Sequence, residues 1–141
     1  MLGRVDPTDK LRIAEIGVYK GRMTAMWNVI LSNRGLSYEY TAIDHFLGSP
    51  ENEKGVDYFG LTMQNLATLF QGRDWLRVVA NDSLSEVMKY PDDYFDIVYV
   101  DAAHEHESVK ADIAAWLPKV KTGGVIWRRL CGGLAWRRAG S

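Results

Sequence analysis

Two ionisable residues close together follow an apolar run and have the types needed for acid–base chemistry. Asp101 and His104 come directly after the run at 95–100. A histidine, whose pKa lies near neutrality, beside a carboxylate is the usual pairing for removing a proton from a hydroxyl group. We therefore predict Asp101 and His104 as the catalytic residues. A structural role for His104 at the start of the following helix is the alternative.

A glycine-containing segment, 15–21, closes the first apolar run of the chain. Gly17 and Gly21 let the backbone turn tightly and approach a ligand, and a helical pattern begins directly afterwards. This segment, which begins with Glu15, is a candidate cofactor loop. An ordinary strand-to-helix turn would have the same pattern.

Polar residues also follow the second and third apolar runs. Asp44 ends the second run, where a carboxylate faces the crevice beside the glycine segment and can accept hydrogen bonds from a pair of ribose hydroxyls. Asp82 and Ser83 end the third run and can offer an acceptor and a hydroxyl to an adenine edge. The same pair is equally typical of an N-terminal helix cap.

The elements that must position these residues alternate along the chain. Apolar runs predict strands at 11–17, 40–46, 76–82, 95–104 and from 124, and helical spacing predicts helices at 21–33, 56–70, 83–89 and 105–117. Such alternation requires crossover connections, so we expect an α/β fold: a Rossmann-like, doubly wound, mainly parallel sheet with helices on both faces. Ligands of such sheets lie beyond the carboxyl ends of the strands.

One helical segment carries large apolar residues that could be core or a cofactor contact. Met23, Met26 and Trp27 recur at helical spacing within 21–33. Residues of this kind usually pack inside a domain. We expect them in the core.

Composition limits the classes of protein. The chain has 141 residues, 47% hydrophobic and 25% charged, as expected of one globular domain. Its single cysteine, Cys131, excludes an intramolecular disulfide and a cysteine-based zinc site. No apolar run approaches the roughly 18 residues that span a bilayer, and the charged amino terminus lacks a signal-peptide pattern, so we expect a cytoplasmic protein without membrane contact. His104 and His106 point in different directions on a helix, so we expect no metal there.

With these residues in place, the chain resembles the class I S-adenosylmethionine-dependent methyltransferases, in particular their small-molecule O-methyltransferase-like group. The resemblance covers residues 12–126 and rests on AEIGVYKG, YTAIDHF, VVANDS and FDIVYVDAAHEHESVKADIAAWLPKVKTGGVI. It implies S-adenosylmethionine as cofactor, S-adenosylhomocysteine as product, and O-methylation of a small molecule or a sugar hydroxyl. It further implies contacts to the methionine part by Glu15, Gly17 and Gly21, to ribose by Asp44, to adenine by Asp82 and Ser83, and near the sulfonium by Asp101.

The carboxyl-terminal end departs from this family. All 18 acidic residues lie at or before Asp112, whereas six basic residues follow it. We therefore divide the chain into a methyltransferase domain at 1–126, incomplete at its carboxyl end, and an atypical basic tail at 127–141. Back-translation of Trp127–Cys131 with CGN arginine codons, read one base later, can encode the family's Gly-Asp-Asp-Tyr, which suggests a frame change near Ile126. A genuine short variant is the alternative.

The altered tail has consequences for the site and the sheet. Metal-dependent relatives add acidic or amide ligands after the fifth strand, and only Asp101 remains here, so we expect no complete divalent-metal site. A fold that stops after strand five leaves that strand as an open edge, which predicts a homodimer through it. A noncatalytic methyltransferase-like binding module, or an inactive truncated fragment, is the alternative function. Nucleic-acid binding by the two Trp-Arg-Arg groups, at 127–129 and 136–138, is a third possible function that the sequence does not favour.

Overall fold

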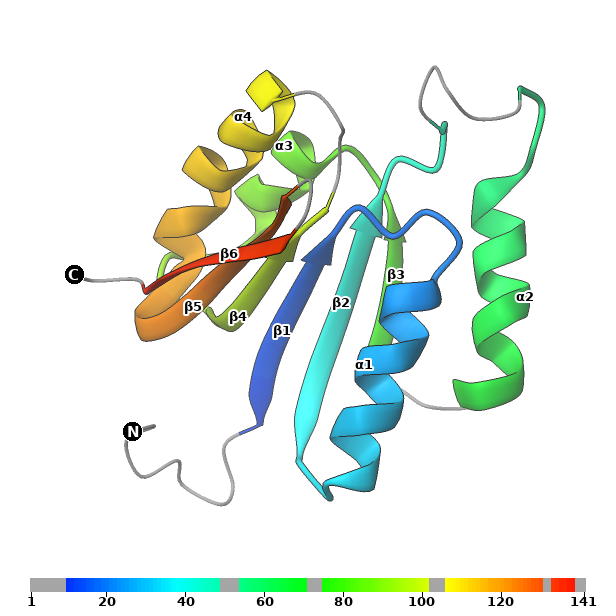
Figure 1. The fold of residues 1–141 in the computed structure, drawn as a ribbon, viewed down its shortest axis with the longest axis horizontal. Helices are drawn as coiled ribbons and strands as arrows, with labels where there is room; N and C mark the ends of the chain where they lie inside the picture. The colour runs from blue at the N-terminus through cyan, green and yellow to red at the C-terminus, as the bar shows by residue number, and fades with distance from the viewer. Residues whose placement is uncertain (1–9, 49–53, 71–74, 102–105, 131–132, 139–141) are drawn as a thin grey trace.

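A six-stranded sheet organises the chain in the computed structural model, which describes residues 10–48, 54–70, 75–101, 106–130 and 133–138. The strands lie in the order β3-β2-β1-β4-β5-β6 (Figure 1). Their bounds are β1 Leu11–Ile16, β2 Tyr38–Asp44, β3 Leu76–Ala80, β4 Phe95–Val100, β5 Val120–Leu130 and β6 Gly133–Arg138. The pairings among β1 to β5 are parallel. The strand order reverses between β1 and β4, which is where ligands bind in sheets of this kind.

Helices cover both faces of the sheet, as predicted. Helices α1 (Arg22–Asn33) and α2 (Tyr58–Phe70) lie on one face, and α3 (Ser83–Glu86) and α4 (His106–Trp116) lie on the other (Figure 1). Two short 3-10 turns, η1 (Val87–Lys89) and η2 (Leu117–Lys119), follow α3 and α4. The Rossmann-like, doubly wound fold expected from the sequence is therefore confirmed. No helix among the described residues is long and apolar enough to cross a membrane.

The alternation of side chains along the central strands builds two cores. On β1, Ile13 packs under α1 and α2, whereas Ala14 and Ile16 pack against the turn η1 and the helix α4. Trp116 at the end of α4 is completely buried in the second core. The central strands are thus apolar on both faces, as parallel strands between two helical layers must be.

The prediction for the apolar residues of α1 is wrong in part. Met26 is 46% exposed, whereas Thr24 and Asn28 are completely buried. The reason is that the sheet presents polar groups beneath this helix. The Thr24 hydroxyl donates to Glu15 at 2.7 Å, and Tyr38 donates to the Asn28 side chain at 2.9 Å. A polar stripe of α1 therefore turns inward and part of its apolar stripe faces outward.

Strand β6 corrects the expectation that strand five forms an open edge. It pairs antiparallel with β5, with Val125 opposite Arg138 and Leu130 opposite Gly133. Since β5 continues through Leu130, part of the basic tail belongs to the sheet. The edges of the described sheet are β3 and β6.

Candidate functional site

Asp44 lies at the carboxyl end of β2, and its carboxylate binds the backbone of the glycine segment. One oxygen, Oδ2, accepts hydrogen bonds from the N–H groups of Val18 and Tyr19, both at 2.8 Å. The other, Oδ1, accepts from the N–H of Phe46 at 2.9 Å. A carboxylate has about four acceptor positions, and these N–H groups fill three of them. The fourth, on Oδ1, is available to a ligand hydroxyl, with Nδ1 of His45 lying 3.7 Å from that oxygen.

The loop at 17–21 is also held from the side of α2. The Thr62 hydroxyl donates to the carbonyl of Tyr19 at 2.6 Å, and the Asn65 amide donates to the carbonyl of Lys20 at 3.0 Å. Gly21 has a φ of 84°, and a Cβ there would lie 3.1 Å from the Thr62 methyl group. Glycine is therefore required at position 21 by both backbone conformation and space.

Glu15 lies beneath this loop and is completely buried. Its Oε1 accepts hydrogen bonds from Thr24 and Tyr40, both at 2.7 Å, while Oε2 has no hydrogen-bond partner within the described part of the chain. Burial raises the pKa of the Glu15 carboxyl from an ordinary 4.5 to about 7, although the two hydrogen bonds lower it. Glu15 thus lies on the α1 side of the sheet and does not line the cavity described next.

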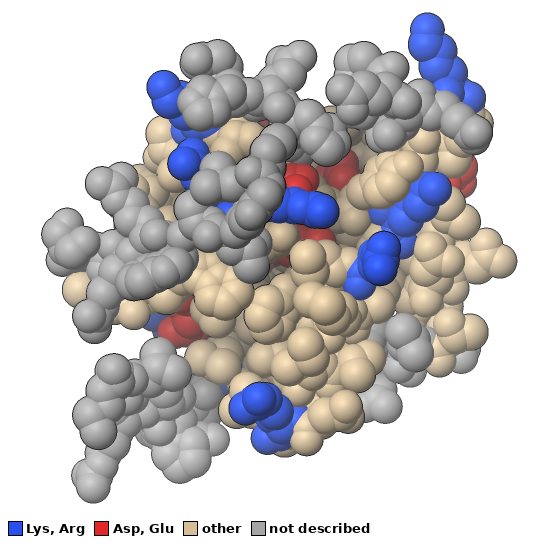
Figure 2. Space-filling view, in the orientation of Figure 1, with Lys and Arg blue, Asp and Glu red and all other residues tan. Residues whose placement is uncertain are grey.

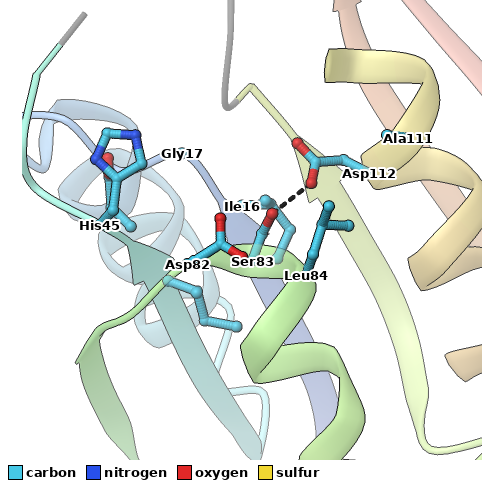
Figure 3. A pocket seen from close by; sticks show the side chains of 10 residues that line it. Ile16, Gly17, His45, Asp82, Ser83, Leu84, Ala111 and Asp112 are labelled. Atoms are coloured by element: carbon cyan, nitrogen blue, oxygen red, sulfur yellow. Dashed lines mark hydrogen bonds and ion pairs between the residues drawn. The ribbon is translucent and has the colours of Figure 1, made fainter. Parts of the chain in front are cut away.

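A cavity of about 230 Å³ opens at the carboxyl ends of β1, β2 and β3 (Figure 3). It brings together residues that are far apart in the sequence: Gly17, Asp44, Asp82 and Ser83, with Ala111 and Asp112 of α4 opposite them. Four predicted site residues therefore share one cavity at the expected edge of the sheet. The volume is below the roughly 300–1,000 Å³ of complete ligand pockets, so it would hold part of a larger ligand.

Asp82 and Ser83 have different partners within this cavity. Asp82 is the N-cap of α3 and accepts from the Ser85 N–H at 3.1 Å. The Ser83 hydroxyl donates to the carboxylate of Asp112. The helix-cap alternative therefore accounts for the hydrogen bonds of Asp82.

Asp112 is a site residue that the sequence reasoning missed. Only 5% of the residue is exposed, and burial together with the nearby Asp82 raises its pKa, whereas the hydrogen bond from Ser83 lowers it. The signal was its spacing, three residues after Val109 and four before Trp116, which places the carboxylate on the buried face of α4.

Asp101 follows β4 beside the start of the glycine loop. Its backbone N–H donates to the carbonyl of Ile16 at 2.7 Å, and its Oδ2 lies 3.5 Å from Nη1 of Arg129 on β5. His104, the other predicted catalytic residue, lies outside the described residues. Within the part of the chain that the structure describes, no three His, Cys, Asp or Glu side chains gather as metal ligands.

Comparison with known proteins places this chain among methyltransferases. Residues 14–127 match the family model described as a methyltransferase domain. A Staphylococcus aureus structure described as a putative caffeoyl-CoA O-methyltransferase is 21% identical with a TM-score of 0.60, and the match covers 84% of this chain and 49% of that protein. The O-methyltransferase NovP is 18% identical with a TM-score of 0.67, and the match covers 83% of this chain and 55% of NovP. A methyltransferase from Podospora anserina, solved with S-adenosylhomocysteine, is 17% identical with a TM-score of 0.60. The match covers 83% of this chain and 44% of that protein.

These structural likenesses, all under 25% identity, show the fold. The chain spans about half the length of the solved structures that it matches. No curated protein matches the chain.

Proposed function

This chain belongs to the methyltransferase domain family, and from that premise we propose that it binds S-adenosylmethionine at the carboxyl edge of its sheet and serves in O-methylation of a small molecule or a sugar hydroxyl. The observation that carries the proposal is the meeting of Gly17, Asp44, Asp82 and Ser83 around one cavity. These residues come from the ends of three neighbouring strands, where sheets of this kind bind nucleoside-containing ligands.

The parts of the site fit the parts of the cofactor. The loop from Gly17 to Gly21 would hold the methionine part, with Glu15 buried beneath it. The remaining acceptor position of Asp44 would take one ribose hydroxyl, and the cavity would take the adenine. The volume of about 230 Å³ and the mixture of carboxylates and apolar walls support this division.

The residues of the site would promote methyl transfer mainly by positioning the cofactor and the acceptor hydroxyl. When bound, S-adenosylmethionine supplies a methyl group on a positively charged sulfur. The carboxylate of Asp101 would stabilise positive charge beside the glycine loop, and His104 would take the proton from the acceptor hydroxyl. Holding the acceptor oxygen in line with the methyl group would carry most of the rate enhancement.

Calorimetric titration with S-adenosylhomocysteine tests cofactor binding. We expect one site per chain, and at least tenfold weaker binding by Asp44→Ala, because that variant loses both the loop anchor and the ribose acceptor. Asp92→Ala, which removes an exposed carboxylate paired with Lys119, should bind normally. Absence of binding by the folded wild-type chain would contradict the proposal.

A noncatalytic binding module is the second candidate. The two candidates differ in the acceptor pocket, which in such folds depends strongly on loops outside the shared sheet. Methyl-transfer assays with phenol, sugar and hydroxy-acid acceptors separate the two candidates. Turnover dependent on His104 supports the enzyme, whereas cofactor binding without turnover on any acceptor supports the module.

The location and assembly of the protein remain predictions from the sequence. We propose a cytoplasmic protein with a small-molecule acceptor and without a nucleic-acid partner. On the face shown in Figure 2, the Lys and Arg side chains of the described residues lie in several small groups separated by uncharged surface, so this face offers nucleic acid no single continuous basic patch of described residues. The homodimer predicted through an open edge of strand five lacks that edge in the described sheet, because β6 covers β5.

A further inference from the structure

Asp112 offers a carboxylate to the cavity from the helical side (Figure 3). It comes from α4, whereas the other polar lining groups come from the ends of strands and from the start of α3. The described lining holds three carboxylates, those of Asp44, Asp82 and Asp112, together with His45, and it holds no Lys or Arg. A cavity lined in this way favours a ligand edge that donates hydrogen bonds.

The other two candidate groups at this end of the cavity already have local partners. Oδ2 of the Asp82 carboxylate caps α3 by accepting from the N–H and the hydroxyl of Ser85 at 3.1 and 3.4 Å, and Asp82 is exposed, whereas only 5% of Asp112 is exposed. The Ser83 hydroxyl donates its one proton to Oδ1 of Asp112. That hydrogen bond fixes the orientation of the Asp112 carboxylate and leaves Oδ2 as its second acceptor atom.

From this arrangement we infer that Asp112, rather than Asp82, recognises the 6-amino group of the adenine ring. The inference rests on the proposed cofactor site and adds a specificity-determining residue to it. An adenine amino group donates hydrogen bonds, whereas the 6-oxo group of hypoxanthine accepts them. A buried carboxylate would therefore select the adenosyl compound and reject its inosyl counterpart.

The test compares two ligands and two matched variants. S-adenosylhomocysteine and S-inosylhomocysteine are titrated into the wild-type chain, Asp112→Asn and Asp82→Asn. Both variants replace one carboxylate by an amide, and asparagine caps a helix about as well as aspartate does, so Asp82→Asn should keep α3 intact. We expect the wild-type chain and Asp82→Asn to prefer the adenosyl compound by about tenfold or more, and Asp112→Asn to lose most of that preference.

Four outcomes would overturn the inference. A preference lost in Asp82→Asn but kept in Asp112→Asn would assign the role to Asp82. A preference kept in both variants, or absent from a wild-type chain that binds both compounds, would show that neither carboxylate reads the amino group while leaving the proposed function intact. A folded wild-type chain that binds neither compound would overturn the proposed function together with the inference.

A measurement on the wild-type chain covers the case in which Asp112→Asn does not fold. Aspartate carboxyl carbons are labelled with ¹³C, and the titration of Asp112 is followed by NMR with each ligand bound. A donated N–H stabilises the charged carboxylate, so the adenosyl compound should lower the pKa of Asp112 and the inosyl compound should not. Equal titration with both ligands would overturn the inference.

Discussion

The carboxylate of Asp44 accepts a hydrogen bond of 2.8 Å from the backbone N–H of Val18, across 26 residues of sequence. This contact joins the end of β2 to the glycine loop that follows β1. A residue expected to bind the ribose is thus also part of the structure that shapes the loop.

Removing this anchor should loosen the loop before it affects the rest of the fold. In Asp44→Ala, the N–H groups of Val18 and Tyr19 lose their acceptor, so the free energy of unfolding should fall by about 1–3 kcal/mol. Hydrogen exchange should accelerate at these two amides more than in the centre of β1. Asp92→Ala serves as the control, and equal protection of the loop in both variants would contradict the anchoring role.

The buried carboxyl of Glu15 should make stability depend on pH. Its pKa is raised from 4.5 to about 7 in the folded chain, so the unfolded state releases the proton first as pH rises. The contribution of Glu15 to the free energy of unfolding is therefore present below pH 4.5 and falls, by on the order of 3 kcal/mol, as pH rises through 7.

Urea unfolding between pH 4.5 and 8 measures this dependence. The Glu15→Gln variant cannot titrate, so its stability relative to the wild-type chain should increase with pH. Glu39→Gln, which changes an exposed carboxylate, should follow the wild-type profile. Parallel profiles for Glu15→Gln and the wild-type chain would refute the raised pKa.

Arg129 should influence the charge preference of the site more than the stability of the fold. Its ion pair with Asp101 is 3.5 Å long, and the two side chains are 64% and 28% exposed, so its loss should cost less than about 1 kcal/mol. In Arg129→Ala, the affinity for S-adenosylmethionine, divided by the affinity for S-adenosylhomocysteine, which lacks the sulfonium charge, should rise about two- to tenfold at low salt. An unchanged ratio, equal to that of the exposed control Arg34→Ala, would separate Arg129 from the cofactor site.

Strand β6 should protect the edge of β5 from association. Deleting residues 133–141 exposes the backbone groups of 125–130 that pair with β6, and such an edge can pair with a second chain. Sedimentation velocity should show greater self-association of this shortened chain than of a chain lacking only 139–141. Identical sedimentation of the two chains would argue against a protective role.

The sequence predicts the strands and helices well because most of them have local signals. The run before Asp101 is apolar throughout and becomes β4, and Gly17 ends β1 as expected. The buried face of α1 is not predictable in this way. Its orientation depends on Glu15 and Tyr38, which lie on other elements and form hydrogen bonds with Thr24 and Asn28.

The remaining differences also arise from contacts between distant parts of the chain. The segment 133–138 lacks a clear strand pattern, and its strand structure comes from pairing with β5. The spacing of Asp44 indicates a ligand contact but cannot reveal that two backbone N–H groups of another loop occupy one of its oxygens. The place of Asp112 in the site could be predicted only by knowing which face of α4 packs against α3, where Ser83 donates to its carboxylate.

The most direct test of the central claim is a titration of the ¹⁵N-labelled chain with S-adenosylhomocysteine, followed by two-dimensional NMR. If the cofactor binds at the carboxyl edge of the sheet, the largest shifts will fall on amides of the loop 17–21, the end of β2 and the start of α3. Arg34 and Lys119, which lie away from this edge, should shift little. Shifts centred elsewhere in a saturable titration, or none at all in the folded chain, would contradict the account.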